Sequence, residues 1–419
     1  MKKQSNTSDS TIRIFNLHRQ PKQTNVVVEK TNKNKPWVNY DADNMFPQKM
    51  VGLVDGSAIH SGLVETKAKF IAGEGLVFDG ENADAAEEWF DTRVDIQELL
   101  ENTGADMALL NGFNWEVIYD RGGSIDSITH KDITRIRSGE LIKGEVSHYY
   151  FSSDWLRATK KRNISEDDDF APVEIAAYNF EAGDNKQLIY VKSYKQGKDF
   201  YPEPEYIGAL NWIEVGGKIS QFYSTNLDNG FSSSTHIHVF GKFDDEQEAR
   251  LSQKLNENLT GVENGGELVV TTGTTEEGMP VITELPTFGN ANVFNELARK
   301  TNEEIAAAHR VPLALTNMPF ASGMQSEGLA IKESLQLFQN TVIRPKQQKI
   351  ERAINKILKD VGLQATVEIK PLTPVNFVQS DAIKLATQTV DELRKEGGLE
   401  PLEVEQVITQ PDGDATNNG

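Results

Sequence analysis

The stretch from Asn290 to Val361 constrains the fold of this 419-residue chain most, because it reads as two long amphipathic helices joined by a loop. Over 290–310, apolar and small residues recur at spacings of three and four, the period of a helix that buries one face. These residues are Phe294, Leu297, Thr301, Ile305 and Ala308. The pair Val311-Pro312 ends this helix, since a residue before proline avoids the helical region. A polar loop over 313–325 and a much longer helix over 326–361 are expected to follow.

The longer helix is predicted to have two faces and a kink. Its apolar face carries Ile343, Ile350, Ile354, Ile357 and Val361. Its basic face carries Lys349, Arg352, Lys356 and Lys359. Pro345 lies inside the helix, removes one backbone donor and is expected to kink the axis. The basic face has two interpretations: a solvated helix surface, or a contact with a neighbouring acidic subunit or with DNA.

Residues 38–205 predict a mixed α+β domain. Helical spacing appears in FPQKMVGLV, AIHSGLVETKAKFIAG and DIQELLENTGADMALL. A β-hairpin is expected to turn at Gly122-Gly123. Further strands are expected at 147–152, 173–178 and 188–194, with ISEDDDFAP as an acidic surface loop.

The character of the sequence changes at Tyr201. The prolines of YPEPEY predict an extended connection into a helix that ends near Tyr223. The pair Gly216-Gly217 is expected to break or bend that helix, since each glycine costs about 1 kcal/mol relative to alanine. Residues 227–288 read as a compact insert with the strands THIHVF, ELVVTT and VITEL around one helix.

The charge of the chain is strongly negative and unevenly distributed. The net charge is −20, whereas residues 1–40 hold eight basic and two acidic residues. The last 29 residues, 391–419, hold two basic and eight acidic residues. Proteins that grip nucleic acid usually have the opposite sign, so this is not a conventional sequence reader. The polar residues before Trp37 are expected to form a mobile arm.

No catalytic or metal motif stands out. Cysteine is absent, and no Walker A, GxSxG or HExxH pattern occurs. His236 and His238 share one face of a strand without an evident third ligand, and His309 is expected to cap or enter the core. The acidic run 166–169 lacks the glycine and distal glutamate of a calcium loop. No secretory signal and no membrane-spanning run of about 18 apolar residues is apparent, so we expect neither.

In the order of its segments the chain resembles the portal protein family of tailed bacteriophages, in its short, siphovirus-like type. The resemblance covers about Val38 to Leu402. It is carried by FIAGEGL, YPEPEYIGAL, TGVENGGELVV, EEIAAAHRVPLAL and EGLAIKESLQLFQNTVIRPKQQKIERAINKIL. It implies an α+β portal fold with wing, stem, clip and short crown parts, assembled as a ring around a central channel.

The resemblance also implies a division of the chain into named parts. These are an arm (1–37), a wing (38–205), a stem helix (206–226), a clip insert (227–288), a second stem helix (290–312), a tunnel loop (313–325), a kinked channel helix (326–361), a wing strand (362–375), a crown (376–402) and an acidic tail (403–419). The tunnel loop would face DNA with Asn317, Met318, Pro319, Phe320, Ser322 and Met324.

The partners implied are a ring of twelve copies and double-stranded DNA bound without sequence preference. A terminase motor, the major capsid protein or scaffold, and a head–tail adaptor are implied as well. No cofactor, no enzymatic activity and no membrane contact is expected, and the protein would sit in the virion after assembly in the host cytoplasm. Two alternatives stay open: another head–tail connector or minor capsid component, and a hydrolase with an unrecognised active site.

Overall fold

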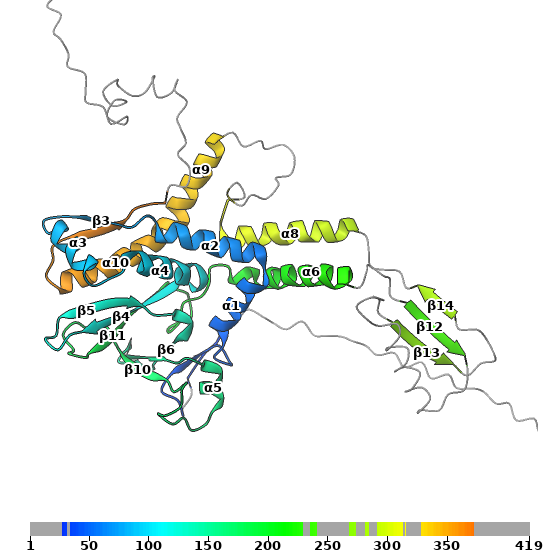
Figure 1. Ribbon diagram of the computed structural model, residues 1–419, viewed down its shortest axis with the longest axis horizontal. Coiled ribbons are helices and arrows are strands. Elements are labelled where there is room, and N and C mark those ends of the chain that lie inside the picture. Colours follow the sequence, from blue (N-terminus) through cyan, green and yellow to red (C-terminus); the bar gives the residue numbers. More distant parts are fainter. Residues whose placement is uncertain are drawn as a thin grey trace, which may run out of the picture.

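The computed structural model describes residues 27–31, 34–228, 235–240, 268–273, 281–284, 291–312, 315 and 328–372. Figure 1 shows an α+β block at one end, two helices that leave it side by side, and a small sheet beyond them. The predicted α+β class is confirmed. Within the described residues, no helix is long and apolar enough to cross a membrane.

The α+β block is built on a six-stranded sheet with the strand order β5-β4-β11-β10-β9-β6. In that order the strands are Ile125–His130, Gly112–Tyr119, Lys186–Lys192, Val173–Ala177, His148–Phe151 and Ile136–Ser138. Only β10 and β11 run parallel, and the predicted hairpin is the pair β4 and β5. Six successive residues of β4, 112–117, are buried, so both faces of this strand are covered, and helix α4 contacts it. Short strands β7 (Leu141–Ile142) and β8 (Glu145–Val146) form a separate hairpin.

Helices cover the sheet and pack on one another. They are α1 (Phe46–Gly56), α2 (Ala58–Ala72), α3 (Ala83–Asp91), α4 (Ile96–Leu110) and α5 (Trp155–Lys160), with a 3₁₀ turn at Ile133–Arg135. The Asp95 carboxylate caps α4 by accepting from the backbone N–H of Glu98. Asn111 ends α4 in the left-handed conformation with φ 62°. These local signals fix the register in which the apolar face of α4 meets α2 and β4.

The two helices that leave the block are α6 (Leu210–Asp228), preceded by a 3₁₀ turn at Ile207–Ala209, and α8 (Ala291–His309). The predicted break at Gly216-Gly217 is wrong, because α6 is continuous through both glycines. A Cβ on Gly217 would lie 3.0 Å from the carbonyl oxygen of Gly56, so the missing side chain lets α6 pass close to the α1–α2 junction. Arg310, at φ 56°, and Pro312 end α8 as expected.

The small sheet lies beyond the far ends of α6 and α8 (Figure 1). It has the order β13-β12-β14, formed by Leu268–Gly273, Thr235–Phe240 and Val281–Glu284. Its strands coincide with the three predicted for the insert, whose predicted helix lies outside the described residues. β12 is parallel to β13 and antiparallel to β14.

The long C-terminal helix is divided by a π-helical turn. Helix α9 (Gly328–Phe338) leads into the π turn Gln339–Ile343 and then into α10 (Arg344–Asp360). The backbone N–H of Arg344 bonds the carbonyl five residues back, at Gln339. In a regular α-helical turn the ring of Pro345 would clash with the carbonyl of Thr341, four residues earlier. The wider π turn avoids this clash. Figure 1 shows that α9 and α10 run in different directions.

Two short strand pairs complete the block. After α10, β15 (Thr366–Ile369) pairs with β3 (Leu76–Asp79), which returns the chain to the α+β block. At the other end, β1 (Glu29–Thr31) pairs with β2 (Val38–Tyr40). The prediction of a mobile arm up to residue 37 is therefore wrong for residues 27–31 and 34–37, the part of the arm that the structure describes. Val27 is buried, and the Glu29 carboxylate accepts from the N–H groups of 199–201, so this segment is tied to the core.

Candidate contact surfaces and a buried charge cluster

The basic face of α10 lies beside the six-stranded sheet. Lys349, Arg352 and Lys356 line a hollow of about 430 Å³ between α10 and strands β10 and β11. Lys192 of β11 supplies a fourth cation. The walls carry three tyrosines: Tyr149, Tyr178 and Tyr190. Lys359 lines a separate hollow at the end of α10, so the structure brings three of the four predicted basic residues together.

The cations that α10 contributes have few partners within the subunit. Lys349 is half-buried and donates to Ser193 Oγ, and burial lowers the pKa of its ammonium group. The ammonium of Lys356 lies 4.9 Å from the centre of the Tyr178 ring, a cation–π contact. Arg352 is exposed. In the part of the chain that the structure describes, none of the three forms an ion pair with a carboxylate.

A second charged group is buried where α2, α10 and the extended segment 201–206 meet, and it was not predicted. The carboxylate of Glu205 pairs with the ammonium groups of Lys67 and Lys346, each at 3.0 Å. The two lysine side chains are only 1% and 4% exposed. Burial alone would raise the pKa of Glu205, but the two ammonium groups more than offset this and lower it to about 2. The ionised carboxylate therefore compensates two cations inside the protein.

A chain of polar contacts connects this cluster with the hollow. Lys346 donates to Asn111 Oδ1 at 2.9 Å, and Ser193 Oγ donates to the same oxygen at 2.7 Å. Ser193 in turn accepts from Lys349 on the wall of the hollow. Burial lowers the pKa of Lys346 to about 8, although Glu205 acts in the opposite direction. The first turns of α10 are thus fixed to the α+β block by polar and charged contacts as well as by apolar packing.

Two histidines lie next to this cluster and join α2 to the end of α8. His60 Nδ1 and His309 Nε2 are 2.8 Å apart, so one imidazole donates to the other. Tyr206 stacks on His309 with ring centroids 4.7 Å apart and meets His60 edge-on at 4.6 Å. Burial, followed by the nearby Lys67, lowers the pKa of His60 to about 4 and that of His309 to about 2. Both rings are neutral at physiological pH, and His309 is a core residue, one of its two predicted roles.

The sequence does contain a signal for the buried lysines. Lys67 lies four residues after Leu63 and four before Ile71, on the apolar face of α2. Lys346 lies three residues after Ile343 and four before Ile350, again on a buried face. A lysine at an apolar position of an amphipathic helix predicts a nearby buried anion, because a buried charge without a partner is costly. What the sequence does not identify is the anion itself, since Glu205 is distant in sequence from both lysines.

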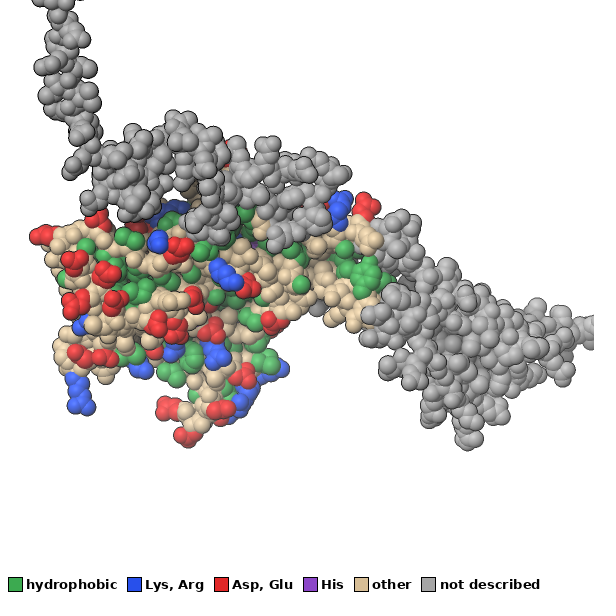
Figure 2. Space-filling model, turned by 45° about the horizontal axis from the view of Figure 1, so that its top comes forward, with side chains coloured by type: hydrophobic (Ala, Val, Ile, Leu, Met, Phe, Trp, Pro, Cys, Tyr) green, Lys and Arg blue, Asp and Glu red, His purple; other side chains and the backbone are tan. Residues whose placement is uncertain are grey.

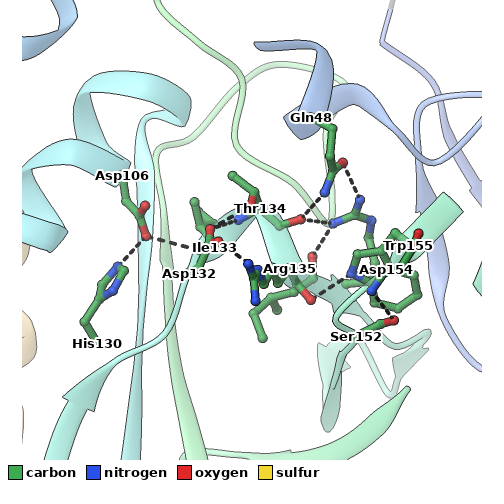
Figure 3. Close-up of polar contacts among 12 residues, drawn as sticks. Gln48, Asp106, His130, Asp132, Ile133, Thr134, Arg135, Ser152, Asp154 and Trp155 are labelled. Carbon is green, nitrogen blue, oxygen red and sulfur yellow. Dashed lines mark hydrogen bonds and ion pairs between the residues drawn. The ribbon is translucent and has the colours of Figure 1, made fainter. Parts of the chain in front are cut away.

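A third network, shown in Figure 3, fastens the turn between β5 and β6 to the helices around it. Asp106 of α4 contacts His130 Nε2 at 2.8 Å and accepts from the backbone N–H of Ile133. Gln48 of α1 donates to the carbonyl of Thr134 at 2.8 Å, and the Trp155 indole donates to that of Arg135 at 2.7 Å. Burial raises the pKa of Asp106 to about 6, against the opposing effect of His130. The contacts all fasten one structural turn, and this network forms no open site.

Some of the remaining predicted residues lie within the part of the chain that the structure describes, and others lie outside it. The six tunnel-loop residues, Asn317, Met318, Pro319, Phe320, Ser322 and Met324, lie outside the described residues. So do the crown and the acidic tail. Pro345 is the second residue of α10, directly after the π turn. His236 and His238 lie on β12. Among the described residues, no three histidine or carboxylate side chains are grouped to hold a metal ion.

The surface of the α+β block is acidic on the face drawn in Figure 2. Between residues 79 and 106 the chain has ten acidic residues, and Arg93 is the only basic one. Arg93 is already used within the subunit, because it donates to the carbonyls of Ile125 and Trp89. The helices α3 and α4 therefore present an acidic surface to solvent.

Comparisons with known proteins agree with this architecture. No protein-family model matches the chain. The chain is 23% identical over 204 residues to a probable portal protein of Haemophilus phage HP1. That match covers 48% of this chain and 55% of the relative, so the chain spans about half the length of the curated relative that it matches.

Solved structures match over more of the chain. Proteins in the neck of an empty gene transfer agent (GTA) particle and in the virion of the native particle align with 85% of this chain and 95% of theirs. The TM-score is 0.53 and the identity 17% in both cases, so the likeness concerns the fold. An HK97 family phage portal protein from Corynebacterium diphtheriae aligns at a TM-score of 0.41, below the level at which a shared fold can be argued. The chain is thus similar in sequence to a probable phage portal protein over about half its length, and it shares its fold with a protein of the GTA virion neck.

Proposed function

We infer that this chain is the portal protein of a tailed phage or phage-like particle. In this role, copies of the chain form a ring at one vertex of the capsid, and DNA enters and leaves through the ring. The sequence match to a probable portal protein carries the proposal. The shared fold supports it, because the matched GTA proteins come from the neck of a particle.

The arrangement of the elements is suited to a conduit. Helices α6 and α8 pack side by side and extend from the α+β block toward the three-stranded sheet (Figure 1). In the proposed ring of twelve they form the stem, and the sheet of β12, β13 and β14 is the clip that docks the terminase motor and later the tail connector. The α+β block is the wing, which faces the capsid protein or scaffold. ATP hydrolysis belongs to the motor, so no cofactor is needed here.

The charge of the chain fits passage of DNA without retention. Cationic surfaces bind duplex DNA by releasing counterions, which makes a cationic channel adhesive. A chain of net charge −20 avoids this. The predicted tunnel loop over 313–325 has no charged side chain, so it would touch the duplex without forming salt bridges.

Electron microscopy of the purified full-length protein tests the proposal. We expect rings with a central hole, with twelve subunits in class averages or by native mass spectrometry. A globular monomer at micromolar concentration, with no ring in the presence of scaffold or capsid protein, would contradict the portal function. Turnover of a hydrolysable substrate by such a monomer would favour the enzyme alternative instead.

A further inference from the structure

Two surfaces of opposite charge lack partners within the subunit. One is the cationic hollow defined above, where Lys349, Arg352 and Lys356 form no ion pair among the described residues. The other is an acidic ridge of exposed carboxylates on α3 and α4. The ridge consists of Asp84, Glu87, Glu88, Asp91, Glu98 and Glu101. Within the described chain, none of these carboxylates pairs with a cation either.

We propose that the acidic ridge of one subunit docks into the cationic hollow of the next subunit around the ring. This proposal rests on the proposed portal function and specifies how the ring closes. A ring of identical subunits uses head-to-tail contacts, in which two different patches of the same chain meet. The hollow and the ridge are two such patches, and both belong to the α+β block, the part expected to form the wing.

The composition of the hollow favours a carboxylate-bearing helix over a DNA duplex. Phosphate-binding surfaces rely on cations that extend toward the backbone of the duplex. Here Lys349 is half-buried and bonded to Ser193, and the ammonium of Lys356 lies over the ring of Tyr178. Three tyrosine rings line the walls, and they can pack against the methylene groups of a glutamate whose carboxylate reaches the cations. A flexible carboxylate side chain can enter such a hollow and reach the half-buried Lys349, whereas a phosphate in a stiff duplex can reach only the exposed Arg352 and Lys356.

Repulsion within each patch adds to the argument. Like charges three or four residues apart on a helix destabilise it, and α3 and α4 each carry such pairs, for example Glu98 and Glu101. On the other side, burial lowers the pKa of Lys349, Glu205 opposes this, and Arg352 adds a smaller lowering effect. Docking of the ridge into the hollow relieves both repulsions at once. Electrostatic contacts of this kind determine which surfaces of identical subunits meet.

Charge reversal in the full-length protein provides the test. R352E/K356E reverses two exposed cations of the hollow, and E98K/E101K reverses two carboxylates of the ridge. Each double variant should reduce the fraction of protein in rings at least tenfold, measured by native mass spectrometry at equal concentration. The quadruple variant carries both reversals and should close rings again. K160E/R162E makes the same charge change on exposed residues outside the hollow and should leave the ring fraction unchanged.

The outcomes separate this proposal from the portal function itself. If the wild type forms rings but R352E/K356E forms them equally well, the hollow does not hold a neighbouring subunit and the docking proposal fails alone. Rings of R352E/K356E that lose affinity for a 30-base-pair duplex would assign the hollow to DNA instead. A quadruple variant that stays monomeric, with circular dichroism like the wild type, would overturn the pairing with Glu98 and Glu101. A wild type without rings would refute the portal function first.

Discussion

At the residue scale, the most consequential group is Glu205, which compensates two lysines in the interior. Its side chain is 21% exposed, whereas those of Lys67 and Lys346 are 1% and 4% exposed. Loss of one partner from a buried ion pair is costly because the remaining charge stays buried without compensation. Glu205→Gln should therefore lower the free energy of unfolding by about 3 kcal/mol. Urea denaturation followed by tryptophan fluorescence measures this change.

A surface ion pair gives the matched control for that substitution. Glu65 pairs with Lys69 at 2.8 Å on the exposed face of α2, and both side chains are more than 60% exposed. Exposed pairs of this spacing contribute little to stability, because water screens them. Glu65→Gln should thus leave the unfolding midpoint nearly unchanged. Equal losses of stability in the two variants would show that Glu205 has no special role where α2, α10 and the segment 201–206 meet.

The paired imidazoles of His60 and His309 predict a loss of stability in mild acid. Their pKa values in the folded state are lowered to about 4 and about 2, from an ordinary value near 6.5. Below pH 6.5 the unfolded chain therefore binds two protons that the folded chain does not, so unfolding becomes more favourable as the pH falls. Between pH 7 and pH 5 the pair should cost about 4 kcal/mol in total.

The measurement is the free energy of unfolding at pH 7, 6 and 5 for the wild type and for His60→Gln/His309→Gln. The double variant is expected to have the shallower pH dependence, whatever its absolute stability. His148→Gln, which changes a partly exposed imidazole, is the control and should keep the steep dependence. A double variant with the same slope as the wild type would show that the buried pair is protonated in the folded protein.

At the element scale, the close packing of α4 against α2 depends on one glycine. A Cβ on Gly104 of α4 would lie 2.5 Å from the carbonyl oxygen of Ala68 and 3.2 Å from the backbone nitrogen of Ala72, both on α2. Gly104→Ala gains helix propensity but must push the two helices apart, so it should destabilise the protein by about 2 kcal/mol. Gly62→Ala in α2 meets nothing within 4 Å and should stabilise by up to about 1 kcal/mol. Thermal unfolding at matched protein concentration distinguishes the two, since subunit association also shifts the midpoint.

The elements that local sequence determines were predictable, and those that depend on tertiary contacts were not. Apolar spacing and the pair Val311-Pro312 were enough to predict α8 and its end. The break expected at Gly216-Gly217 was wrong, because the glycines permit a close approach of α6 to Gly56 that propensity alone does not reveal. The strand pair β1–β2 was missed for the same reason: its stability comes from contacts with residues 199–201.

The candidate contact surfaces were predictable to a similar degree. Helical spacing places Lys349, Arg352 and Lys356 on one face of α10, as the hollow requires. It places Lys359 on the same face as well, although in the structure Lys359 lines a separate hollow beside the β3–β15 pair. Lys192, Tyr149 and Tyr190 come from strands far away in sequence, and Tyr178 directly follows β10, so no periodicity of α10 could have identified them.

At the scale of the whole molecule, charge has two opposed tasks in the proposed ring. Neighbouring subunits need attraction between patches, whereas the DNA path must avoid attraction to phosphate. Both conditions can be met if the cations of the chain form ion pairs within the subunit and with neighbouring subunits. Inside the block, Glu205 pairs with Lys67 and Lys346. The proposed docking pairs the cations of the hollow with carboxylates of the next subunit. Fewer cations are then left to attract the phosphates of the DNA.

The tunnel loop over 313–325 is where this balance can be disturbed most directly. Ser322→Asp adds one negative charge per subunit, or about twelve in the proposed ring, where the uncharged loop is expected to face the duplex. Repulsion between these carboxylates and the phosphates should slow packaging and weaken retention of packaged DNA, most strongly at low salt, where screening is weak. Packaging of DNA into capsids in vitro, followed by nuclease protection, measures both effects. Ser124→Asp makes the same change in the exposed turn between β4 and β5 and should be silent. If Ser322→Asp packaged and retained DNA like the wild type at 50 mM salt, the loop would not face the DNA.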